Sequence, residues 1–226
     1  MPRIAILISG RGSNMQRLVE VSQQNLPMVE IVLVASNAPC AGIEFARDHG
    51  LTTATIERSV YASRADQETA LAQTLVAAAP DWIFLAGYMA VLSAKFVAQF
   101  AGKILNIHPS LLPDFKGLDT HERALSAGVA QHGASVHMVT AALDDGPVIL
   151  QAGLTIAAGE DAKSLAAKVL GLEHQLYPFV LSSLATGALV LTDGAPYWQP
   201  REQVIKDAPA SSRHFLETTA IWPAAR

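Results

Sequence analysis

The stretch Arg3-Ile-Ala-Ile-Leu-Ile-Ser-Gly-Arg-Gly-Ser-Asn14 decides the fold of this chain. Ile4–Ile8 is a short continuous apolar run, which is typical of a strand buried on both faces of a parallel sheet. A glycine loop follows, and then a helical pattern in which Met15, Leu18 and Val19 share one stripe. Strand, glycine loop and helix in this order form the first unit of an α/β fold.

The alternation of strand and helix continues to about residue 107. Further strands are expected at 29–35, 52–56, 81–86 and 103–107, and helices at 41–49, 64–79 and 93–100. This alternation predicts a Rossmann-like, mostly parallel sheet with right-handed crossovers, flanked by helices.

After a helix at 120–127 the pattern changes. The runs 134–139 and 148–156 are strand-like and flank a turn, which predicts an antiparallel pair toward the C-terminal part. A long helix is expected at 161–181, where Pro178 should kink or end it, and a short strand at 188–191. The later residues show no clear pattern, so we expect one domain of residues 1–226, with a core of about 1–192 and a surface tail at 193–226.

Composition limits the functional classes. Half of the 226 residues are hydrophobic and 16% are charged, which is enough to bury a sizeable core. A net charge of -4 without a basic cluster argues against nucleic-acid binding. The single Cys40 cannot form an intrachain disulfide and fits a reducing compartment. No apolar run is long enough for a signal peptide or a membrane span, so we expect a cytoplasmic protein without membrane contacts, either a monomer or a homodimer.

The glycine loop at 10–14 is suited to phosphate binding. Glycines let the backbone approach an anion, and the free amides of a helix N-terminus point toward it. Met15 stands where the dinucleotide fingerprint has its third glycine, and no P-loop lysine follows, so a monophosphate is favoured over NAD or ATP. The alternative is a tight strand-helix turn in which Ser13 or Asn14 is the N-cap.

A second polar stretch lies in Leu105-Asn-Ile-His-Pro-Ser-Leu-Leu-Pro113. Asn106 and His108 share one face if strand geometry lasts through His108, and an imidazole at a strand end suits proton transfer near neutral pH. Asp144 lies in a later turn and is either a partner for this histidine or an ordinary turn former. The apolar loop at 87–92 either lines a pocket for a flat aromatic ligand or is core beneath a loop.

The polar residues fit some catalytic chemistries poorly. The chain has no His-x-x-x-His pair and no second cysteine, and His132 and His137 are expected on opposite faces of a strand, so no metal site is predicted. A serine hydrolase elbow is also missing. An amide, an imidazole and a carboxylate instead suit acyl transfer without a covalent enzyme intermediate.

Several motifs together carry a resemblance to a known family. They are Ile8-Ser-Gly-Arg-Gly-Ser-Asn14, Leu85-Ala-Gly-Tyr-Met89, Asn106-Ile-His-Pro-Ser-Leu-Leu-Pro113, Gly133-Ala-Ser-Val-His137, Leu143-Asp-Asp-Gly-Pro-Val-Ile-Leu-Gln151 and Glu173-His174. From Ile4 to about Leu191 the sequence resembles the phosphoribosylglycinamide formyltransferases, a folate-dependent family of purine biosynthesis. The Asn-x-His-Pro-Ser-x-Leu-Pro motif with a later Asp is shared by folate-dependent formyltransferases generally. The glycine loop narrows the resemblance to the glycinamide ribonucleotide branch.

The resemblance implies the formyltransferase fold and a specific reaction. A formyl group would pass from the co-substrate 10-formyltetrahydrofolate to the amino group of glycinamide ribonucleotide, directly and through a tetrahedral intermediate, without a metal. His108 would be the acid and proton shuttle, Asn106 a donor to the oxyanion, and Asp144 the group that keeps His108 protonated.

Binding residues follow from the same resemblance. The ribonucleotide site would comprise Gly12, Ser13, Asn14 and Glu173. The folate site would comprise Arg64, Met89, Ala90, Val91, Leu92, Asn106, Thr140, Ala141, Ala142, Leu143 and Asp144. Three positions depart from the usual bacterial pattern: Ala90 stands where an Arg is common, Asp114 where a basic residue is common, and Asp119 where a His is common.

Three alternative functions share parts of this pattern. A methionyl-tRNA formyltransferase would carry a C-terminal RNA-binding barrel and a basic surface, for which this acidic chain has no room. A formyltetrahydrofolate hydrolase would use the same three residues with water as acceptor, but would not need the loop at Gly12–Asn14. A non-catalytic nucleotide- or folate-binding domain would not need the triad.

Overall fold

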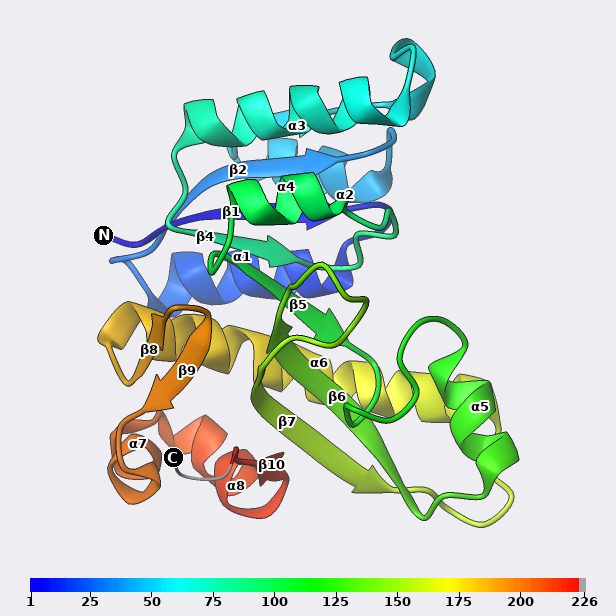
Figure 1. The fold of residues 1–226 in the computed structure, drawn as a ribbon. Helices are drawn as coiled ribbons and strands as arrows, with labels where there is room; N and C mark the ends of the chain where they lie inside the picture. The colour runs from blue at the N-terminus through cyan, green and yellow to red at the C-terminus, as the bar shows by residue number, and fades with distance from the viewer. Residues whose placement is uncertain (224–226) are drawn as a thin grey trace. The chain divides into compact units, whose positions relative to one another are not determined.

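The computed structural model describes residues 1–223, which belong to two compact units (Figure 1). The first unit comprises Met1–Asn106, and the second begins at Ile107. The boundary falls inside one strand, β5 (Ile104–His108).

The first unit contains a parallel sheet. Its strands are β1 (Arg3–Ile8), β2 (Glu30–Ser36), β3 (Thr53–Thr55), β4 (Trp82–Leu85) and the first part of β5, in the order β5-β4-β1-β2-β3. Ile4–Ile8 of β1 is completely buried. A strand covered on both faces needs apolar residues throughout. The continuous apolar run therefore explains why this strand lies in the centre of the sheet.

Helices cover both faces of the parallel sheet. They are α1 (Ser13–Asn25), α2 (Ala41–Asp48), α3 (Arg64–Ala78) and α4 (Ala94–Gln99), with a short 3-10 turn at Arg58–Val60. Figure 1 shows α3 and α4 on the near face of these strands and α1 and α2 on the far face. The chain runs outward through α1 and α2 and returns through α3 and α4, as right-handed crossovers require. The predicted α/β alternation is confirmed.

The second unit contains antiparallel strands. β6 (Gln131–Met138) pairs with β7 (Val148–Thr155), and β7 pairs on its other edge with β10 (Ala220–Ile221). The predicted antiparallel pair is therefore confirmed. Its register shifts between Val136 and His137, whose partners Leu150 and Val148 leave Ile149 of β7 as the extra residue. The short helix α5 (Thr120–Ala127) precedes β6.

One long helix, α6 (Ala162–Thr186), packs against β6 and β7. We expected Pro178 to kink this helix or end it, but the helix continues to Thr186. A proline inside a helix costs about 3 kcal/mol. Tyr177, Val180 and Leu181 around it are fully buried, and this packing offsets the lost hydrogen bond.

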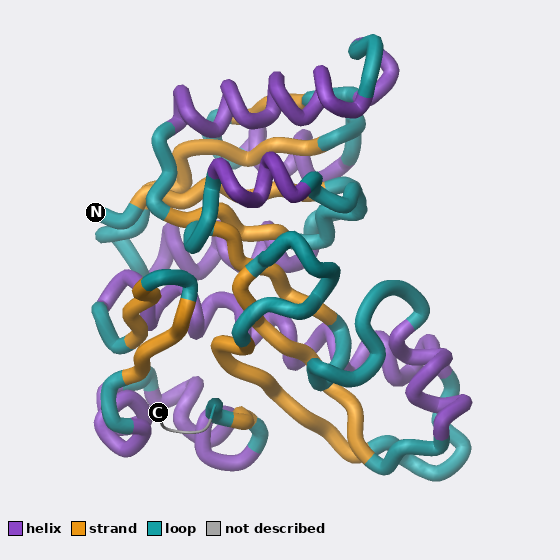
Figure 2. Tube along the Cα trace, viewed as in Figure 1, coloured by secondary structure: helices purple, strands orange, loops and turns teal. Residues whose placement is uncertain are grey.

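The residues after α6 are folded, although their sequence shows no clear pattern. They form a hairpin of β8 (Leu189–Thr192) and β9 (Ala195–Trp198), then α7 (Arg201–Asp207), α8 (Ala210–Thr218) and β10 (Figure 2). Phe215 and Leu216 are buried, unlike residues of a surface tail. Elements this short span too few turns to show a period. Residues 224–226 of the expected tail lie outside the described part.

Between residues 1 and 223, the structure contains no helix that is both long enough and apolar enough to cross a membrane.

Candidate active site

His108 is the last residue of β5, and its side chain is nearly buried. Its Nδ1 lies 3.5 Å from Oδ2 of Asp144, and the two side chains are only 6% and 10% exposed. Strand geometry lasts through His108, as the expected common face of Asn106 and His108 requires. The second unit thus brings together two residues that are 36 positions apart in the sequence.

The backbone of Asp144 has an uncommon conformation. Its φ is 48°, in the left-handed region that aspartate tolerates better than most residues. Two residues later, a Cβ on Gly146 would lie 1.8 Å from the carbonyl oxygen of Met138. Only glycine fits there, so the turn that carries Asp144 is seated against the end of β6.

Three consecutive residues, which we call the strap (Phe115, Lys116 and Gly117), contact His108, Asp144 or the neighbouring Asp145. The carbonyl oxygen of Phe115 lies 3.0 Å from Nε2 of His108. The amide of Gly117 donates to Oδ2 of Asp144 over 2.9 Å. Lys116 forms an ion pair with Asp145, which lowers the pKa of that carboxyl group below its usual value.

The contact with the strap determines which ring nitrogen of His108 carries a proton. A carbonyl oxygen only accepts hydrogen bonds, so Nε2 of His108 is protonated in this arrangement, while Nδ1 faces the carboxylate of Asp144. Both ring nitrogens are therefore engaged. One of these contacts must give way when the imidazole passes a proton to a bound molecule.

His137 also faces Asp144, with Nε2 at 3.7 Å from Oδ1. Its Nδ1 donates to the carbonyl of Met138 over 2.9 Å. Burial lowers the pKa of His137, so the ring is neutral at neutral pH and Nε2 carries no proton. Of the two histidines that face Asp144, His108 is therefore the one that can form a charged pair with its carboxylate.

A buried hydroxyl holds the loop that follows His108. Oγ of Ser135 donates to the carbonyl of Ser110 over 2.6 Å and accepts from the amide of Leu112 at 3.0 Å and from Nε2 of Gln151 at 2.7 Å. Gln151 also donates to the carbonyl of Leu112. The hydroxyl has its full set of partners, so β6 and β7 fix the loop through one oxygen.

Two further histidines lie beneath the strap. Nδ1 of His121 is 3.1 Å from Nε2 of His132, and the ring of His132 meets Phe115 edge-on at 5.9 Å. Burial lowers the pKa of His121, and it lowers that of His132 to about 4. Arg123 completes the support, because its guanidinium stacks on Phe115 and donates to the carbonyl of Lys116 over 2.6 Å.

The first unit holds the glycine loop. Gly12 is the N-cap of α1 with φ 68°, and no side chain caps the helix. The alternative with Ser13 or Asn14 as N-cap is therefore wrong, because the helix already begins at Ser13. Uncapped amides at this end suit an anion. The loop is also tightly packed, since a Cβ on Gly42 would lie 2.8 Å from the carbonyl oxygen of Gly10.

The loop after β4 lies beside the glycine loop. Ser9 donates its amide to the carbonyl of Gly87 over 3.1 Å, and its hydroxyl accepts from the amide of Met89 over 2.8 Å. Arg64 donates to the carbonyl of Val91. Met89 is 66% exposed and Val91 58%, so this loop presents apolar side chains instead of burying them.

Other predicted binding residues lie in both units. Leu92 is buried and Ala90 is half-buried in the first unit; in the second unit Thr140, Ala141, Ala142 and Leu143 are exposed, and Glu173 is buried in α6. The structure thus brings His108 and Asp144 together in one unit, and the two loops at Gly12 and Met89 together in the other.

Sequence reasoning missed the supporting residues. Ser135 and Gln151 are register partners on β6 and β7, and a polar residue in the middle of each of two buried strands is a signal that was present in the sequence. The role of Phe115 left no such signal, because its backbone makes the contact. Among the described residues, no group of three or more His, Cys, Asp or Glu side chains is arranged to hold a metal ion.

Comparison with known proteins agrees with this geometry. A family model described as formyl transferase matches residues 2–181. The phosphoribosylglycinamide formyltransferase of Escherichia coli (strain K12) is 43% identical over 195 residues, which cover 86% of this chain and 92% of that protein.

Solved structures show the same similarity. Glycinamide ribonucleotide transformylase 1 from Symbiobacterium toebii matches with a TM-score of 0.83 and 37% identity, covering 88% of this chain and 95% of that one. A formyltetrahydrofolate deformylase from Pseudomonas putida KT2440 matches with a TM-score of 0.77 and 25% identity, covering 88% of this chain and 70% of that one.

Proposed function

The chain belongs to the formyl transferase family, and from this premise we propose that it transfers the formyl group of 10-formyltetrahydrofolate to the amino group of glycinamide ribonucleotide in purine biosynthesis. The observation that carries the proposal is the buried pair of His108 and Asp144 at the end of β5. Residues 1–226 act together as one formyltransferase domain.

The glycine loop receives the phosphate of the ribonucleotide. Amides at Gly12, Ser13 and Asn14 begin an uncapped helix, where an anion replaces the missing cap. Glu173 binds the ribose hydroxyls, for which a carboxylate is a strong acceptor.

The exposed apolar side chains receive the folate. Met89 and Val91 of the first unit are each more than half exposed, and covering them with a flat ring removes apolar surface from water. The family resemblance assigns Arg64, Ala90, Leu92 and Thr140–Leu143 to the same ligand. The folate supplies the formyl carbon.

At that carbon, the amine of the ribonucleotide attacks and a carbon–nitrogen bond forms. The side-chain amide of Asn106 donates a hydrogen bond to the formyl oxygen as it gains negative charge at the tetrahedral carbon. His108 gives that oxygen a proton, which returns to the imidazole when the carbonyl re-forms. Asp144 faces Nδ1 of the imidazole and orients the ring. When the bond from carbon to the folate nitrogen breaks, the proton lost by the amine passes to that nitrogen, so no covalent bond to the protein is needed.

The strap takes part in the proton step. Nε2 of His108 is engaged by the carbonyl of Phe115 and Nδ1 by Asp144. Exchange of the Phe115 contact for the formyl oxygen frees Nε2 while Asp144 still holds the other side of the ring.

Formyl release from a 10-formylfolate tests the proposal. Absorbance of the deformylated folate is followed with and without glycinamide ribonucleotide. We expect release only when the ribonucleotide is present, and a loss of about 10²- to 10⁴-fold in His108→Ala. His214→Ala, which changes an exposed histidine of α8, is the matched control and should retain full activity.

Each contrary result has a definite meaning. Release without the ribonucleotide would assign the hydrolase reaction instead. Full turnover in His108→Ala would remove the assigned role of the imidazole. Tight binding of both ligands without any release would identify a binding domain.

A further inference from the structure

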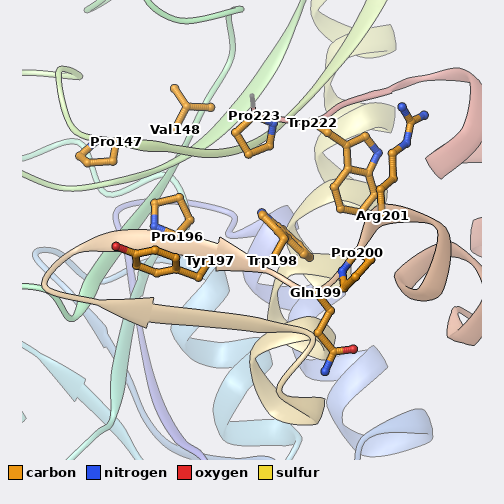
Figure 3. Close-up of a pocket in the computed structure, with 10 residues that line it drawn as sticks. All are labelled: Pro147, Val148, Pro196, Tyr197, Trp198, Gln199, Pro200, Arg201, Trp222 and Pro223. Carbon is orange, nitrogen blue, oxygen red and sulfur yellow. The ribbon is translucent and has the colours of Figure 1, made fainter. Parts of the chain in front are cut away.

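A pocket of about 520 Å³ lies in the second unit, at the start of β7 and along β9 (Figure 3). It is lined by Pro147, Val148, Pro196, Tyr197, Trp198, Gln199, Pro200, Arg201, Trp222 and Pro223. None of these residues belongs to the predicted catalytic, ribonucleotide or folate sets, and most lie beyond the segment matched by the family model. Its volume is in the range of small-molecule sites.

The aromatic walls of this pocket are fixed by their own contacts. The indole N–H of Trp198 donates to the carbonyl of Ile149 over 3.0 Å, and its ring stacks on Phe179 at 6.0 Å with 7° between the planes. Trp222 meets Trp198 at 5.0 Å and 72°. Two indoles at right angles, one of them anchored to β7, form a preformed corner that accepts a flat ring by stacking or edge-on contact.

Arg201 is the only charged residue of the lining. Its guanidinium carbon lies 5.8 Å from the centre of the Trp222 ring. Figure 3 shows the two side chains as neighbours. Within residues 1–223 it has no carboxylate partner. A guanidinium without a counter-ion beside an aromatic corner favours a ligand that is both aromatic and anionic, and its planar fork matches a carboxylate.

We propose that this pocket is a second ligand site, which binds a small flat aromatic carboxylate with its ring against Trp198 and Trp222 and its carboxylate on Arg201. A cationic ligand would be repelled by the one charge present. Sugars would find few partners, because prolines, a valine and aromatic rings make up most of the wall. The site goes beyond the proposed function and does not depend on it.

Calorimetric titration of the full chain tests the site with two probes that share one ring system. Naphthalene-2-carboxylate carries the charge, and 2-naphthamide has nearly the same shape without it. We expect the carboxylate to bind at least about tenfold more tightly than the amide.

Variants locate the binding. Arg201→Gln should remove the preference for the carboxylate, whereas Lys206→Gln, which removes an exposed charge from the same helix α7, should retain it. Tyr197→Ala should lower the affinity for both probes by a similar factor, because it removes an aromatic side chain from the pocket lining and no charge. Melting temperatures close to that of the unmodified chain report that Arg201→Gln and Tyr197→Ala are folded.

Three outcomes would overturn the proposal. They are the absence of binding by either probe, equal affinities of the two probes for the unmodified chain, and a carboxylate preference that survives Arg201→Gln. Failure of the formyl-transfer assay would leave these binding results standing, so the two proposals fail separately.

Discussion

The glycine loop of the first unit and the loops around His108 of the second unit are both sites at strand ends, but they are built differently. The backbone makes the first: Gly12 has a left-handed conformation, and α1 begins without a side-chain cap. Side chains make the second, because Ser135 and Asp144 each fix a loop distant in sequence and Arg123 holds the nearby strap. A backbone site is sensitive to an added Cβ, whereas a side-chain site is sensitive to a removed polar atom.

The largest expected effect is on the side-chain site. Asp144→Asn removes the charge that faces Nδ1 of His108, and we expect kcat to fall about 10²-fold while the melting temperature changes little. Asp145→Asn is the matched control. Its carboxylate is exposed and, among the described residues, pairs with Lys116 alone, so the kcat of this variant should change less than about threefold. Equal losses in the two variants would show that net charge, and not the pairing of His108, is what matters.

Removal of the central hydroxyl should cost stability next. Ser135→Ala leaves the amide of Leu112, the carbonyl of Ser110 and the amide of Gln151 without this partner, and we expect a loss of about 2 kcal/mol. Urea unfolding measures this, with Ser211→Ala on the exposed face of α8 as control. A loss no greater than that of the control would mean that the strands, and not the hydroxyl, hold the loop after His108.

The glycine loop is tested by adding one carbon. Gly12→Ala places a Cβ at φ 68° and 3.0 Å from Cε of Met15, which costs about 1 kcal/mol. We expect the KM for the ribonucleotide to rise roughly tenfold, because the backbone amides no longer point at the phosphate. The kcat should change little. Gly171→Ala in α6, where an added Cβ has nothing within 4 Å, should leave both values nearly unchanged. A fall in kcat alone would contradict a purely binding role for this loop.

The smallest effect concerns acid. The pKa of His132 is lowered to about 4 in the folded chain from 6.5, so the unfolded chain binds more protons between these values. Stability is therefore lost as the pH falls from 6.5 toward 4. We expect the melting temperature to drop by about 3 °C between pH 7 and pH 5.5, and His132→Phe to reduce that drop. An equal reduction in His214→Phe would assign the slope to histidines in general.

The same contrast explains what could be predicted from the sequence. The strand Arg3–Ile8, the glycine loop and the motif around His108 are local patterns, and their elements were expected within a residue or two of their observed bounds. Strand order was limited to few choices by right-handed crossovers. Local patterns do not predict the contact between Phe115 and His108, because this contact depends on the path of the loop that joins them.

Two errors also have physical causes. Pro178 was expected to interrupt its helix. The helix continues because the neighbours of Pro178 are buried, and this burial depends on tertiary packing. The segment after residue 192 showed no period because its elements are short. Its aromatic residues Trp198 and Trp222 were the available signal, since large apolar side chains are seldom placed where nothing covers them.

The strand β10 has a consequence for how the protein survives in a cell. Its two residues occupy part of the outer edge of β7, and the amide of Gly153 bonds to the carbonyl of Thr219 beside them. An edge strand with open amides and carbonyls recruits the strands of other molecules. A proteolytic cut between α7 and α8 that released β10 would therefore expose the edge of β7 to pairing with other molecules. In the intact protein, β10 covers part of this edge.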